Sequence, residues 1–60
     1  MRKGSRVQYI GTKNELMIGK VYRVLHKSGN WLEIMAPVRY LDGSVHLSKA
    51  CYPIDDFRAV

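Results

Sequence analysis

Residues that break regular secondary structure recur along this chain about every eight residues. They stand at five positions: Gly11, Gly19, Gly29, Pro37 and Gly43. This spacing leaves little room for helices, and the apolar residues from Leu16 to Leu32 do not sustain the i, i+3, i+4 stripe of an amphipathic helix. Several short strands joined by turns fit the pattern instead. The sequence therefore predicts an all-β fold.

Five segments show the polar–apolar alternation, or the β-branched and aromatic residues, that are typical of strands. They are residues 6–9, 20–26, 31–36, 44–47 and 57–60. Pro37 is expected to end regular pairing, because proline cannot donate a hydrogen bond to a strand ladder. Residues 38–43 then form a loop or a ragged hairpin. A short 3₁₀ turn is expected within residues 48–56, before the last strand.

A chain of 60 residues makes one domain, predicted over residues 1–60, with a small core. Five short strands must close, or nearly close, into a barrel to bury one face and protect their edges. Alternation along the strands places eleven side chains in this core: Val7, Tyr9, Leu16, Ile18, Tyr22, Val24, Leu32, Ile34, Val45, Leu47 and Phe57.

Three segments, taken in order, resemble small SH3-like barrel proteins of bacteriophages and prophages. Residues 3–7 (KGSRV) resemble the opening of many such barrels, and residues 19–24 (GKVYRV) resemble their "G-K-x-Y-x-V" second strand. Residues 52–60 (YPIDDFRAV) resemble their ending, a 3₁₀ turn followed by "x-x-F-x-x-V". The resemblance implies a five-stranded SH3-like barrel and a role as an accessory or host-modulating factor. The Ala-Leu-Tyr-Asp-Tyr run of peptide-binding SH3 domains is absent, which argues against recognition of polyproline peptides.

The chain is basic, with 10 Lys and Arg against 5 Asp and Glu and a formal net charge of +5. This excess favours an acidic partner, such as nucleic acid or an acidic protein face. The single cysteine, Cys51, cannot form an internal disulfide, which suits a reducing compartment. The chain has neither a secretory signal pattern nor an apolar run of membrane-spanning length. A cytoplasmic protein that does not enter a membrane is expected.

Residue types that carry catalysis are present but poorly spaced for it. His26, His46 and Cys51 lack the close ligand pairs of a structural zinc site. Asp55 and Asp56 are adjacent, so in extended chain their carboxylates point opposite ways, and capping of the 3₁₀ turn is the expected role. The glycines are isolated and form no phosphate loop. The sequence predicts a non-enzymatic binding module with no cofactor, no metal ligand and no catalytic residue.

Binding residues are expected on the outward faces of the strands. Trp31 alternates with Leu32 and Ile34, so it faces solvent as an interface anchor or stacking platform unless strand curvature folds it over the barrel end. Arg6 and Arg23 are expected on adjacent strands, both pointing away from the core. The predicted partner-binding residues are Trp31, Arg23, Arg6, Lys20, Arg39, Tyr40 and Met35.

The leading hypothesis is a phage-encoded modulator that binds, and can inhibit, a bacterial host protein with an acidic surface. Trp31, Tyr40 and Met35 would supply apolar contact, while Arg23 and Arg39 would steer the partner. In the bacterial host, such a protein would act in the cytoplasm.

The alternative is a nucleic-acid-binding barrel with a basic and aromatic face. Convergence of Arg6, Lys20, Arg23 and Trp31 on one face would favour nucleic acid, whereas an apolar patch with few basic neighbours would favour a protein. A homodimer that pairs exposed edge strands is a further option.

Overall fold

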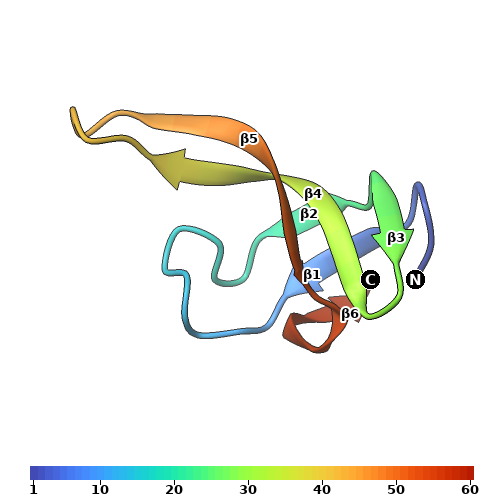
Figure 1. The fold of residues 1–60 in the computed structure, drawn as a ribbon. Helices are drawn as coiled ribbons and strands as arrows, with labels where there is room; N and C mark the ends of the chain where they lie inside the picture. The colour runs from blue at the N-terminus through green and yellow to red at the C-terminus, as the bar shows by residue number, and fades with distance from the viewer.

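The computed structural model describes residues 1–60 and is all-β, as predicted, with one 3₁₀ turn (Figure 1). Its elements are β1 (Arg6–Tyr9), β2 (Val21–Arg23), β3 (His26–Ser28), β4 (Trp31–Arg39), β5 (Val45–Pro53), η1 (Ile54–Asp56) and β6 (Phe57–Ala59). The strands form two antiparallel sheets in the orders β2-β1-β6 and β3-β4-β5. The 3₁₀ turn precedes the last strand, as expected. No helix in the structure has the length and apolar character needed to cross a membrane.

The segment predicted as one strand over residues 20–26 is divided between the two sheets. At its centre, Val24 N–H donates to Ser5 C=O at 2.8 Å, and Leu25 N–H donates to Glu33 C=O at 2.8 Å. Neighbouring residues thus bond to β1 in one sheet and to β4 in the other. The chain has six strands rather than five because this segment changes sheets at Val24 and Leu25.

Pro37 does not end strand pairing, and that prediction was wrong. Tyr40 N–H donates to Ser44 C=O at 2.8 Å, so even-numbered residues of β4 turn their backbone groups toward β5. Odd-numbered residues turn theirs toward β3, which pairs with residues 31–33 alone. Pro37 lies beyond that strand, so no strand partner requires an N–H there, although Pro37 itself is buried. Pairing therefore continues through Pro37 to Arg39.

The hairpin of β4 and β5 is much longer than the sequence predicts. Its register runs without interruption from Trp31–Pro53 to Arg39–Val45, so residues 38–43 belong to a hairpin, the second of the two predicted alternatives, and the predicted strand end at residue 47 is wrong. The turn spans residues 41–43, where Gly43 has φ +88° and its N–H donates to Tyr40 C=O at 2.9 Å. This is the three-residue hairpin connection with glycine in the left-handed conformation. The hairpin projects from the body of the molecule (Figure 1), which measures 34 × 19 × 16 Å.

The core is formed by eight buried side chains from both sheets and the loop between β1 and β2. They are Val7, Tyr9, Met17, Val24, Leu32, Ile34, Ala36 and Phe57. Six of the eleven predicted core residues are among them: Val7, Tyr9, Val24, Leu32, Ile34 and Phe57. Leu16 and Tyr22 are half-buried.

Three predicted core residues, Ile18, Val45 and Leu47, are exposed instead. Residues 14–20 form successive turns, in which Met17 N–H donates to Asn14 C=O and Lys20 N–H donates to Met17 C=O. These turns direct Met17 into the core and Ile18 to solvent, so strand alternation does not apply there. Val45 and Leu47 lie on the projecting hairpin, which no second layer covers.

Tyr22 carries the one buried side-chain polar atom without a hydrogen-bond partner, its hydroxyl oxygen. Burial raises the pKa of Tyr22, and the neighbouring Tyr52 raises it further. A buried hydroxyl that makes no hydrogen bond lowers stability relative to an apolar group of the same shape.

The position of Met17 gives a direct test of the loop. We expect Met17→Ala to lower the free energy of unfolding by about 2–5 kcal/mol, because it leaves a cavity in the core. Ile18→Ala, the matched control one residue away, should change it by no more than about 0.5 kcal/mol. Urea unfolding of both variants measures the difference. A larger loss for Ile18→Ala would show that the alternation, and not the turn, orients this segment.

The Tyr22 hydroxyl gives a second test. Tyr22→Phe should stabilise the protein, by about 1 kcal/mol, because it removes an unsatisfied buried group and keeps the ring. Thermal unfolding measures the change, and Tyr22→Ala, which also removes the packing of the ring, should be destabilising. A clear loss of stability in Tyr22→Phe would mean that the hydroxyl has a bonding partner in solution.

Candidate binding surfaces

The projecting hairpin exposes an unusual number of large apolar side chains. We call this set the hairpin patch: Met35, Val38, Tyr40, Leu41, Val45 and Leu47. Leu41, at the tip, is completely exposed, and Leu47 is 64% exposed. None of these side chains belongs to the core. In the strand register Val38 and Tyr40 continue the face of Ile34 and Ala36, whereas Met35, Val45 and Leu47 lie on the opposite face, so the hairpin patch surrounds the hairpin. Exposed apolar groups in such number typically mark an interaction site rather than a folding requirement.

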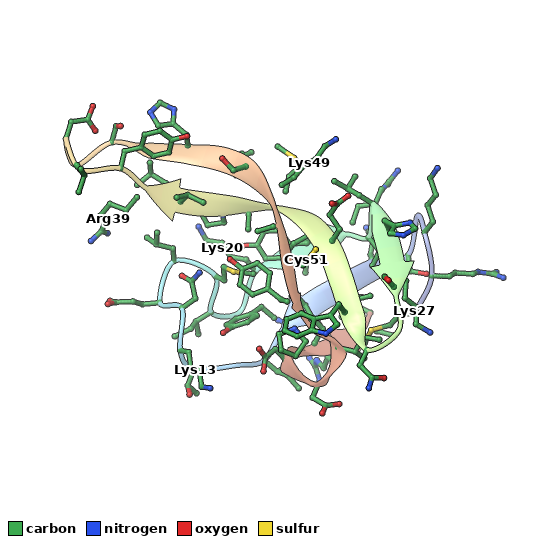
Figure 2. The ribbon with its side chains drawn as sticks, viewed as in Figure 1. Lys13, Lys20, Lys27, Arg39, Lys49 and Cys51 are labelled. Carbon is green, nitrogen blue, oxygen red and sulfur yellow. The ribbon has the colours of Figure 1, made fainter.

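Two cations flank the hairpin patch. In the strand register Arg39 pairs with Val45, and Lys49 pairs with Met35. Figure 2 shows Arg39 near the tip of the hairpin and Lys49 nearer its base, and the register places both at odd-numbered positions. Asp42 is the one acidic residue between Met35 and Lys49. The hairpin thus combines exposed apolar side chains with two positive charges.

The tip of the hairpin is held in shape by a small polar network. Asp42 Oδ1 accepts hydrogen bonds from Ser44 N–H at 2.8 Å and from Ser44 Oγ at 2.6 Å. Ser44 Oγ also lies 2.8 Å from His46 Nε2, and the His46 ring meets Tyr40 edge to face with centroids 4.7 Å apart. The hydrogen bonds from Ser44 lower the pKa of Asp42. The network therefore holds the Tyr40 ring against His46 at the base of the turn.

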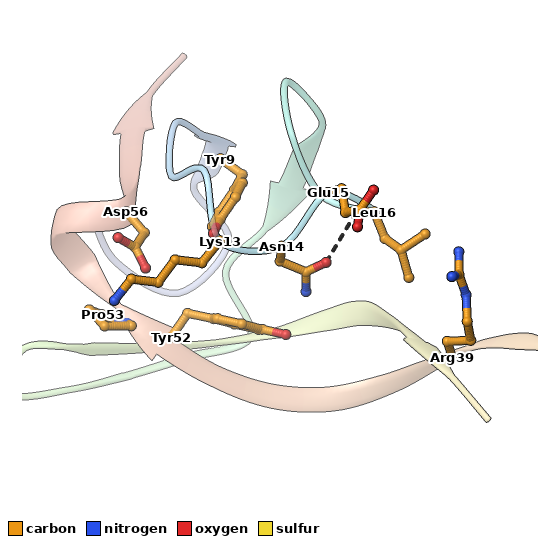
Figure 3. Close-up of a pocket in the computed structure, with 9 residues that line it drawn as sticks. All are labelled: Tyr9, Lys13, Asn14, Glu15, Leu16, Arg39, Tyr52, Pro53 and Asp56. Carbon is orange, nitrogen blue, oxygen red and sulfur yellow. Dashed lines mark hydrogen bonds between the residues drawn. The ribbon is translucent and has the colours of Figure 1, made fainter. Parts of the chain in front are cut away.

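A cleft of about 500 Å³ lies between the loop that follows β1 and the end of β5 (Figure 3). Its lining residues are Tyr9, Lys13, Asn14, Glu15, Leu16, Arg39, Tyr52, Pro53 and Asp56. The Tyr9 and Tyr52 rings both pack edge to face on Phe57, at 5.5 and 6.3 Å between centroids. Side chains of both charges stand around this aromatic floor, and the cleft has no single electrostatic character.

Gly11 allows the loop to pass over this floor. A Cβ atom at that position would lie 2.6 Å from the Tyr9 hydroxyl oxygen, and the Tyr9 side chain is buried and cannot move aside. Beyond it, Asn14 Oδ1 accepts a hydrogen bond from Leu16 N–H at 3.1 Å. The loop is thus shaped by local contacts on one wall of the cleft.

The structure divides the predicted binding residues among separate surfaces. Met35, Arg39 and Tyr40 lie together on the hairpin. Trp31 is 52% exposed at the start of β4, as alternation predicts, and stands opposite Pro53. It therefore does not serve as a lid over the core.

The basic residues lie elsewhere. Arg6 and Arg23 are directly opposite each other in the sheet β2-β1-β6, and Lys20 is exposed in the turn that precedes β2. Arg6 and Arg23 thus belong to one sheet and Trp31 to the other. The strand register therefore does not join Arg23 and Trp31.

Sequence reasoning missed two exposed residues that matter here, Leu41 and Arg58. Leu41 precedes Asp42-Gly43, a turn signal that in retrospect places it at a loop tip. Arg58 follows the buried Phe57 in β6, so alternation alone puts it outward, on the sheet that carries Arg6 and Arg23.

The structure brings no three His, Cys, Asp or Glu side chains together in an arrangement that would hold a metal ion, and Cys51 is exposed. Comparison of the chain with models of protein families, with curated proteins and with solved structures finds no match.

The Asp42–Ser44 contact makes the hairpin tip sensitive to acid. Because the folded-state pKa of Asp42 is below its ordinary value of about 3.9, the carboxylate stabilises the turn above that pH and loses this effect as pH falls through the folded value. We expect Ser44→Ala to raise the pKa of Asp42 toward the ordinary value. Titration of the Asp42 carboxyl by NMR measures the change.

Asp42→Asn is the control, because its hairpin tip should lack this acid-dependent loss of order. An Asp42 pKa that does not change in Ser44→Ala would contradict the role of the hydroxyl.

Proposed function

We propose that this chain is a non-enzymatic binding module that docks on a protein partner through the β4–β5 hairpin. The observation that carries the proposal is the hairpin patch, six exposed apolar side chains along a hairpin that projects from the body of the molecule. Tyrosine and methionine are enriched at protein interfaces, and both occur here as Tyr40 and Met35. Nucleic acid has no comparable need for an apolar tip, so a protein is the better occupant.

The charge on the hairpin supports a partner with an acidic surface. Arg39 and Lys49 flank the apolar side chains, and Asp42 is engaged by Ser44 in the turn. Positive charge at the rim of an interface accelerates encounter with an acidic partner more than it adds affinity. The excess of basic residues over the whole chain acts in the same direction.

The resemblance to phage proteins suggests where the protein acts and what kind of partner it binds. We propose an SH3-like domain, encoded by a phage or prophage, that acts in the bacterial cytoplasm by binding, and in one form inhibiting, a host protein. The split of one strand segment between two sheets supports the SH3-like assignment, as does the 3₁₀ turn before β6. A second copy of the chain is an alternative occupant, since β4 is the only strand that pairs with β5.

The nucleic-acid alternative, in the form that depends on aromatic stacking, has less support. It requires Trp31 to share a face with Arg6 and Arg23, and these residues belong to different sheets. Protein binding is therefore the function that we place first.

The test is a pull-down from bacterial lysate, with and without nuclease, using the wild-type chain and two variants. Leu41→Ser alters the hairpin patch, and Ile18→Ser is the matched control, since Ile18 is also an exposed apolar residue, 53% accessible, but lies in the loop before β2. We expect a captured protein that survives nuclease, is retained by Ile18→Ser and is weakened about tenfold in Leu41→Ser, as loss of an interface anchor predicts.

Circular dichroism of both variants confirms that they are folded. Capture that nuclease abolishes, or that both variants retain equally, would contradict docking through the hairpin.

A further inference from the structure

The sheet β2-β1-β6 carries a second surface, separate from the hairpin. Its register pairs Arg6 with Arg23 across β1 and β2, and Gln8 with Arg58 across β1 and β6. Paired residues of antiparallel strands project from the same face. Val7 and Tyr9, which alternate with Arg6 and Gln8, are buried, so the arginines are on the outer face. All three arginines are exposed, and we call this surface the arginine face.

The first two arginines of this face are held unusually close. Val24 N–H donates to Ser5 C=O at 2.8 Å, and Tyr9 N–H donates to Lys20 C=O at 2.9 Å. These bonds identify odd-numbered positions of β1 as those bonded to β2, so Arg6 and Arg23 form a non-hydrogen-bonded pair. The Cα atoms of such a pair are about 4.5 Å apart. Two guanidinium groups therefore start from neighbouring points of the sheet.

Arg58 is fixed beside them by an ordered amide. Arg58 Nε donates to Gln8 Oε1 at 2.8 Å, and Gln8 Nε2 donates to Gly19 C=O at 3.0 Å. The glutamine is thus oriented by the loop before β2 and in turn orients the arginine. The terminal nitrogens of Arg58 make none of these bonds and remain able to donate to a ligand.

The pairing of Arg6 with Arg23 lowers the stability of the fold, and no other contact of these two side chains compensates for it. Like charges directly opposite each other destabilise a strand pair, and neither Arg6 nor Arg23 contributes to the core. No acidic residue occupies the face, which consists of Arg6, Gln8, Val21, Arg23, Arg58 and Val60. An anion bound between the guanidinium groups would remove the repulsion.

We infer that the arginine face binds the phosphate backbone of a nucleic acid. The guanidinium group donates two parallel hydrogen bonds to phosphate, and all three cations of the face are arginine rather than lysine. The face has no aromatic residue and only two valines, so it lacks the apolar centre that a protein interface requires. It also lacks a stacking platform for bases. Binding is therefore independent of base sequence and decreases with salt.

This second site is independent of the proposed docking through the hairpin, because it lies on the other sheet. Each phosphate that a protein neutralises contributes about −0.7 to the slope of log affinity against log salt for a single strand, and about −0.9 for duplex DNA. Three arginines thus predict slopes between about −2 and −3. A steeper slope would require cations beyond this face.

The test measures fluorescence anisotropy of labelled 20-nucleotide oligo(dT), a DNA duplex and an RNA of equal length, at low and moderate salt. The wild-type chain should bind all three at low salt and lose affinity as salt rises. Arg23→Glu should weaken binding at least tenfold and, by replacing a repulsive pair with an attractive one, raise the thermal unfolding midpoint. A variant that is more stable yet binds less cannot owe its loss to misfolding.

Lys27→Glu is the matched control, since it makes the same charge change on an exposed residue of the other sheet. Lys27→Glu should weaken binding much less than Arg23→Glu does. Leu41→Ser should leave nucleic-acid binding unchanged, whether or not the hairpin docks on a protein. An equal loss of affinity in Lys27→Glu would mean that binding depends only on the net charge of the chain, and it would contradict the proposed site. Absence of binding at low salt, or competition by polyglutamate as effective as by oligonucleotide, would also overturn it.

Discussion

The chain passes between the two sheets twice, once through η1 from β5 to β6 and once directly from β2 to β3 at Val24 and Leu25. There, adjacent N–H groups donate to Ser5 in one sheet and Glu33 in the other, while the Val24 side chain is buried between them. The crossing forces the inner faces of both sheets against one core. Eight buried side chains are enough to hold the two layers together, although they leave little stability in reserve. Any change that separates the sheets at this point removes the core.

A core this small also explains why the hairpin lies outside it. The inner face of β4 is covered as far as Ala36, and residues beyond Pro37 extend past the opposite sheet. The outer part of the hairpin is therefore stabilised by its own register, by Gly43 in the turn and by the contact between Asp42 and Ser44. Packing within the fold therefore does not explain the apolar character of its side chains, and this is the basis of the proposed docking.

Local alternation in the sequence was sufficient for part of this structure. It correctly predicted that Leu32 and Ile34 face inward and Trp31 outward. Alternation distinguishes two faces of a strand but cannot say whether another layer covers one of them, and for this reason Leu47 was misplaced. The effect of Pro37 was misjudged for a related reason. Whether a missing N–H matters depends on where the neighbouring strand β3 ends, which is a property of the assembled sheet.

The binding surfaces were harder to predict because they depend on which sheet each strand joins. Alternation placed Arg6 and Arg23 outward on neighbouring strands, and the register makes them direct partners. It could not place Trp31 relative to them, because the crossing at Val24 separates the sheets to which they belong. Two packed sheets have two outer faces, and neither contributes to the core. Folding therefore constrains neither the positive charge of the arginine face nor the apolar side chains of the projecting hairpin, which lie on both faces of its ribbon.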